Sequence, residues 1–87
     1  MTIQQAYDKV RLLYGRTEEV RRIYDLGDGY AFLFVSQKHD GVDIRDIHGL
    51  SYDVINKKTG EVESVYPPLN MRRFSNAISI PLSEIVQ

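Results

Sequence analysis

The residues best suited to chemistry in this 87-residue chain are histidines and aspartates that gather between positions 39 and 48. Imidazole and carboxylate groups at such a spacing could surround a divalent metal ion. The candidate ligands are His39, Asp43, Asp46 and His48, with Asp40 beside them. The two histidines are not spaced as on one face of a helix, and the aspartates miss the spacing of a calcium-binding loop. A solvated acidic loop is therefore the favoured interpretation, and a metal site is the alternative.

The sequence contains few other residue patterns that are typical of enzyme active sites. Asp25 and Asp28 could act as paired carboxylates for acid–base work, but they flank a glycine-rich stretch, and aspartate and glycine are standard turn residues. No serine lies in a Gly-x-Ser-x-Gly elbow, and there is no phosphate-binding glycine loop. The absence of cysteine removes thiol nucleophiles and zinc–thiolate sites. We therefore expect neither enzymatic activity nor a cofactor.

Tyrosine and arginine indicate a protein interface instead. The chain has 6 tyrosines, and both residue types are enriched at interfaces because they combine apolar area with hydrogen-bonding groups. Packing within a sheet explains the tyrosines equally well. The residues assigned to partner binding are Tyr52, Tyr66, Arg22, Asp40 and Asp43. Residues 25–53 carry six acidic and two basic side chains, so a basic partner would complement them.

Charge and hydropathy exclude other classes of function. The formal net charge of -1 argues against a general nucleic-acid binder. The longest apolar run, residues 30–35, is far shorter than the ~20 residues that span a bilayer. The first residues lack the positive and apolar regions of a secretion signal, so the expected compartment is the cytoplasm. Self-association through a sheet edge, giving a homodimer, stays open.

The beginning of the chain predicts an amphipathic helix. Apolar residues recur at helical spacing from Ile3 to Tyr14. Thr2 and Gln5 form the pattern of a capping box, and Gly15 is placed to end the helix.

The rest of the chain predicts an antiparallel sheet. Residues 18–25 and 30–35 have the pattern of strands, with Val20, Arg22 and Tyr24 expected on one face of the first. Residues 50–66 predict a hairpin in which Gly60 takes a positive φ, and two prolines then end the last strand. A short helical turn follows, and the tail is either a final edge strand or an extended arm. The fold class is α+β: one domain over residues 1–87, with the N-terminal helix packed on a four-stranded antiparallel meander and a short C-terminal helical turn.

The hairpin also carries a family resemblance. Its stretch Tyr-Asp-Val-Ile-Asn-Lys-Lys-Thr-Gly-Glu-Val, residues 52–62, follows an amphipathic helix and an aromatic strand. In this it resembles small proteins of bacteria, either the YrhB-type, immunity-protein-like group or the PepSY-like group of helix-plus-sheet modules; similar small proteins occur in phages. The resemblance implies docking on another protein and no catalytic residues. We therefore expect a non-enzymatic protein-binding module, immunity-like or regulatory, and the alternative is a metal- or ligand-binding domain that uses residues 39–48.

Overall fold

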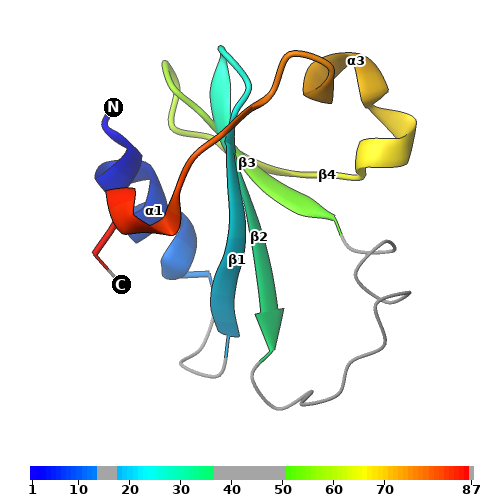
Figure 1. Ribbon diagram of the computed structural model, residues 1–87. Helices are drawn as coiled ribbons and strands as arrows, with labels where there is room; N and C mark the ends of the chain where they lie inside the picture. Colours follow the sequence, from blue (N-terminus) through cyan, green and yellow to red (C-terminus); the bar gives the residue numbers. More distant parts are fainter. Residues whose placement is uncertain (14–17, 37–50, 87) are drawn as a thin grey trace.

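A computed structural model describes residues 1–13, 18–36 and 51–86. These residues form an antiparallel sheet with helix α1 on one face and the short helix α3 on the other (Figure 1). The predicted α+β class is confirmed. The elements, in chain order, are α1 (Ile3–Arg11), β1 (Glu18–Asp25), β2 (Gly29–Ser36), β3 (Tyr52–Asn56), β4 (Val62–Val65), η1 (Pro67–Leu69), α3 (Met71–Phe74), β5 (Ile78–Ser79) and η2 (Leu82–Glu84).

The sheet has the strand order β4-β3-β2-β1-β5. Its first four strands form the predicted meander, in which each strand pairs with the next. The tail corrects the predicted count of four strands, because Ile78 and Ser79 pair with the end of β1 as a fifth, edge strand. The backbone N–H of Ile80 also donates to the carbonyl of Ile23, at 2.9 Å, and holds the tail along β1.

Helix α1 begins as the sequence predicts and ends earlier. The Thr2 hydroxyl accepts from the Gln5 N–H at 3.1 Å, and the Gln5 side chain accepts from the Thr2 N–H at 2.9 Å, which confirms the capping box. The helix ends at Arg11, and the Leu13 N–H closes a tighter turn on the Val10 carbonyl. Leu13 was expected on the buried stripe, but its position beyond the helix leaves it 61% exposed.

The main core lies between α1 and the sheet. Tyr7 is its centre on the helix side: its ring centroid lies 6.2 Å from that of Phe32 and 6.2 Å from that of Phe34. The buried residues of this core are Ala6, Tyr7, Val10, Val20, Ile23, Phe32, Phe34, Ile55 and Ile85. Ile85 follows η2, so the end of the chain closes the core beside α1 (Figure 1). Of the helices in the described part of the chain, none has the length and apolar character needed to cross a membrane.

Strand β1 contains a bulge that changes which side chains share a face. Val20 pairs with Phe34 and Arg22 pairs with Leu33, so Arg21 is an extra residue between them. Val20 therefore packs in the core under α1, whereas Tyr24 packs in the smaller cluster on the opposite face. The predicted alternation, which put Val20 with Arg22 and Tyr24, is wrong because the bulge inserts one residue into the period of two.

Candidate functional site

The sheet face opposite α1 carries a line of rings. The Tyr24 and Tyr52 ring centroids are 5.8 Å apart, and the Tyr52 and Phe74 centroids are 5.4 Å apart in an edge-to-face arrangement. Strand β2 lies between β1 and β3, and its residue Ala31 pairs with Tyr24 on one side and with Val54 on the other. Because the Ala31 side chain is small, it leaves room for the two tyrosine rings to meet across β2. At the end of the line, Nη1 of Arg22 donates to the Tyr24 hydroxyl at 3.4 Å. We call this set of four residues the aromatic row: Arg22, Tyr24, Tyr52 and Phe74.

The electrostatics of the aromatic row favour neutral phenols beside one cation. Burial raises the pKa of Tyr52; the neighbouring Tyr24 adds to this increase, and the charge of Arg22 opposes it. The hydrogen bond to Tyr24 raises the pKa of Arg22 above its already high ordinary value. At neutral pH the row therefore presents aromatic surface with hydroxyl groups and a single positive charge.

The row continues into a shallow apolar groove that is open to solvent. Its volume is about 550 Å³, and its lining residues, Pro67, Pro68, Met71, Phe74 and Ser75, define the proline groove. Phe74 belongs to both the row and the groove. Met71, in the lining, is 74% exposed, and Leu69, two residues before it in the chain, is 81% exposed.

Two prolines and one amide shape the backbone beside the groove. Because proline cannot donate to a strand ladder, the chain leaves β4 at Tyr66 and coils into η1. The Tyr66 carbonyl accepts from the Leu69 N–H at 3.1 Å and from Nδ2 of Asn70 at 2.9 Å. This turn brings α3 back over the sheet (Figure 1).

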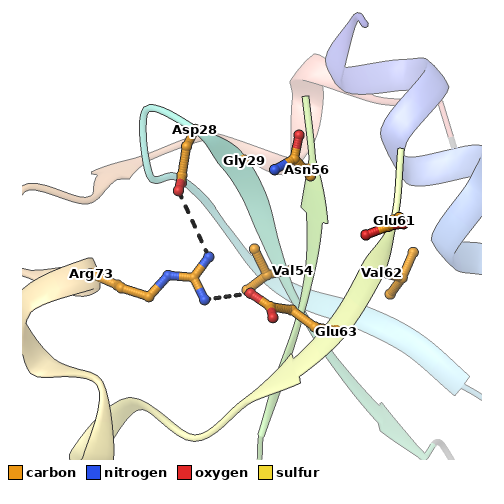
Figure 2. Close-up of a pocket in the computed structure, with 8 residues that line it drawn as sticks. All are labelled: Asp28, Gly29, Val54, Asn56, Glu61, Val62, Glu63 and Arg73. Carbon is orange, nitrogen blue, oxygen red and sulfur yellow. Dashed lines mark hydrogen bonds and ion pairs between the residues drawn. The ribbon is translucent and has the colours of Figure 1, made fainter. Parts of the chain in front are cut away.

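A second, polar pocket lies where α3 meets the sheet. Its volume is about 140 Å³. Figure 2 shows Arg73 reaching from α3 between Asp28, in the β1–β2 turn, and Glu63 of β4. Arg73 makes a hydrogen-bonded ion pair with Glu63, and its Nη2 lies 4.0 Å from Oδ2 of Asp28. The guanidinium therefore connects α3 to two parts of the sheet, and together with the Tyr52–Phe74 contact it positions the proline groove.

A further charged contact involves Asp25, at the β1–β2 turn. Its Oδ1 accepts from the Gly27 N–H at 2.8 Å and from Nζ of Lys57 at 2.8 Å. The Lys57 ammonium also lies 4.6 Å from the centroid of the Tyr30 ring. The hydrogen bond from Lys57, followed by that from Gly27, lowers the pKa of Asp25. This arrangement fastens the β1–β2 turn to the β3–β4 hairpin.

The partner-binding residues predicted from the sequence are only partly brought together. Arg22 and Tyr52 belong to the same aromatic row. Tyr66 is half-buried at the end of β4, where its carbonyl caps the following turn. The sequence did not assign Tyr24, Phe74 or Met71 to partner binding, although Met71 follows the apolar stretch Pro67-Pro68-Leu69 by two positions.

The predicted metal ligands cannot be placed. The candidate residues His39, Asp40, Asp43, Asp46 and His48 lie outside the described residues. Within the part of the chain that is described, no three histidine or acidic side chains come close enough to hold a metal ion. The metal site stays a prediction, which a Zn²⁺-dependent rise in melting temperature, abolished by alanine at His39, Asp43 and His48, would test.

No protein-family model, curated protein or solved structure matches the chain.

Proposed function

We propose that this protein is a small non-enzymatic module that binds another protein through the aromatic row and the proline groove. The supporting observation is the exposure of Met71, 74%, in the lining of the proline groove, and of Leu69, 81%, two residues before it. Large apolar side chains gathered on one exposed surface mark interaction sites in soluble proteins. A partner that covers these side chains would gain roughly 25 cal/mol for each Å² of apolar surface removed from water.

The surface is suited to docking because its parts are held in place before binding. Tyr24 and Tyr52 project from strands, and Phe74 is fixed by its edge contact with Tyr52. Arg73 holds α3 against the sheet through Glu63. Side chains that are already ordered lose little conformational freedom on binding, so more of the contact energy appears as affinity.

The sequence resemblance to immunity-like proteins indicates the form this binding takes. In such a role the protein restrains or regulates its partner by occupying a surface, and no bond is made or broken. The aromatic row and groove provide contact area and one cation, which suffices for docking.

The experiment is cross-linking capture from the source cells with the wild-type chain and two charge variants. Met71→Asp places a charge at the groove, and the first turn of a helix accepts aspartate well. Leu12→Asp is the matched control, because Leu12 is also exposed but follows α1. Circular dichroism verifies that both variants fold.

Capture of one protein by the wild type and Leu12→Asp, with loss of that protein from Met71→Asp, supports the proposal. The proposal fails if no protein is captured, or if capture survives Met71→Asp.

A further inference from the structure

We infer that the partner docks through an extended acidic segment, which places an apolar side chain in the proline groove and a carboxylate on Arg22. This inference rests on the proposed function and adds the chemistry of the partner. Three features carry it. They are the positive charge of Arg22, the guanidinium donors of Arg22 that make no hydrogen bond among the described residues, and the spacing set by the aromatic row.

The aromatic row contains one positive charge, that of Arg22, within the described residues. Arg22 donates a hydrogen bond to the Tyr24 hydroxyl, and in this part of the chain no carboxylate pairs with it. Arg72, on α3, is exposed and likewise has no ion pair among the described side chains. The acidic side chains of the polar pocket, Asp28, Glu61 and Glu63, line it together with Arg73.

Arg22 is able to receive a carboxylate. A guanidinium has five N–H donors in a planar fork, and one of those of Arg22 is directed at the Tyr24 hydroxyl. The side chain is exposed, so the remaining donors reach solvent from the sheet face. Pairing of such a fork with a carboxylate adds geometric specificity as well as energy.

The aromatic row sets the distance between the two contacts. From Tyr24 to Phe74 there are two ring-to-ring steps, of 5.8 and 5.4 Å, and Phe74 lines the groove. An extended chain advances about 3.3 Å per residue, so about three or four residues cover these steps. With the guanidinium beyond Tyr24, the apolar residue and the carboxylate of the partner lie about five residues apart.

The described residues give less support to two other occupants, a second copy and a basic partner. A second copy docking by two-fold symmetry about the aromatic row would bring a second Arg22, which is a like charge, to the same surface. A basic partner, expected from Asp40 and Asp43, depends on residues outside the described part of the chain. The described face favours an acidic partner instead.

The probe is a random library of 12-residue peptides displayed on phage and selected on the immobilised full chain. We expect the enriched peptides to share one large apolar residue and one aspartate or glutamate about five positions away. Enrichment of lysine or arginine in place of the acid would overturn the inference. Light scattering of the free protein tests the second copy, and a dimer that Met71→Asp dissolves would likewise overturn it.

The best peptide is then synthesised and titrated against four variants. We expect Arg22→Gln to weaken binding about ten-fold at low salt, the lower range for a charge-assisted hydrogen bond at an exposed site. Arg22→Lys keeps the charge without the fork and should retain part of the affinity. Arg21→Gln is the matched control, because Arg21 lies in the bulge and pairs with Glu19. Met71→Asp tests the groove.

The outcomes separate this inference from the proposed function. If Met71→Asp loses binding and Arg22→Gln binds like the wild type, the inferred contact between Arg22 and a carboxylate is wrong, and the proposed docking at the groove stands. If Met71→Asp and Arg22→Gln both bind the peptide like the wild type, the acidic contact and the docking at the groove are both wrong. If Met71→Asp and Arg22→Gln both lose binding, and the affinity of Arg21→Gln stays within about two-fold of the wild type, the acidic contact and the docking at the groove are both supported.

Discussion

Replacement of Asp25 by asparagine should lower the free energy of unfolding by about 1–2 kcal/mol at neutral pH. The carboxylate accepts from Lys57 and from the Gly27 N–H, each at 2.8 Å. Hydrogen bonds to charged groups contribute about 1.5–3 kcal/mol, and fully exposed pairs contribute about 0–1 kcal/mol. The Lys57 and Asp25 side chains are 27% and 31% exposed, so the value lies between these ranges. Asparagine keeps the shape and one acceptor oxygen but loses the charge.

The stabilising effect of Asp25 depends on pH in a defined direction. Lys57, and after it Gly27, lower the pKa of Asp25 in the folded protein below its ordinary value of 3.8. The unfolded chain therefore binds more protons in the acid range. The contribution is complete above about pH 5 and is lost as the pH falls through the ordinary value to the lowered one. Asp25→Asn cannot titrate, so its deficit relative to the wild type should shrink in acid.

The assay is thermal unfolding followed by far-ultraviolet circular dichroism, at pH 7 and at about pH 2.5. For a domain of this size 1 kcal/mol shifts Tm by roughly 4–8 °C, so a loss of about 1–2 kcal/mol should make Asp25→Asn melt roughly 4–16 °C lower at pH 7. Asp28→Asn is the control: Asp28 is 67% exposed and lies 4.0 Å from Arg73, so its effect should stay below about 0.5 kcal/mol. An equal deficit of Asp25→Asn at both pH values, or an equal effect of Asp28→Asn, would refute the reasoning.

Three further substitutions test the fold. Phe32 is fully buried under α1, so Phe32→Ala should cost about 3–5 kcal/mol in urea unfolding, and a loss under about 1 kcal/mol would contradict the described core. A Cβ at Gly29 would lie 2.6 Å from the carbonyl oxygen of Ile55 on the neighbouring strand, so Gly29→Ala should cost about 1–3 kcal/mol by the same assay; an unchanged midpoint would mean that the two strands lie farther apart. Thr2→Ala removes half of the capping box and should cost about 1 kcal/mol in thermal unfolding, whereas Thr2→Ser should keep it; equal loss in both variants would exclude the hydroxyl as the cause.

The elements that the sequence predicts well are those with a local physical signal. Thr2 and Gln5 are spaced for reciprocal hydrogen bonds at the start of a helix, and the structure contains both. Gly60 has φ of 72° in the hairpin turn, as the Lys-Thr-Gly-Glu stretch predicts. These features depend on neighbouring residues only, so one sequence is sufficient to predict them.

The features that the sequence does not predict depend on distant residues. The two-residue strand β5 is too short for any alternation, and its place is decided by pairing with Tyr24 and Asp25. The bulge at Arg21 follows from the register with β2 and leaves no mark in composition. Helix α3 has four residues, so it has no helical period from which Phe74 could be assigned to the sheet face. The sequence therefore predicts which types of residue belong to the candidate site, but their arrangement in space follows only from the fold.

The bulge at Arg21 also determines how β1 tolerates a change in its length. Val20 pairs with Phe34 and Arg22 with Leu33, so removal of Arg21 would join two segments that already alternate in phase. The shortened strand would keep Val20 beneath α1 and Tyr24 on the opposite face. Loss of one residue from the continuous ladder at 22–25 would instead turn the remainder of the strand over and expose its apolar side chains. Position 21 is thus where this strand can lose a residue while both faces of the sheet keep their side chains.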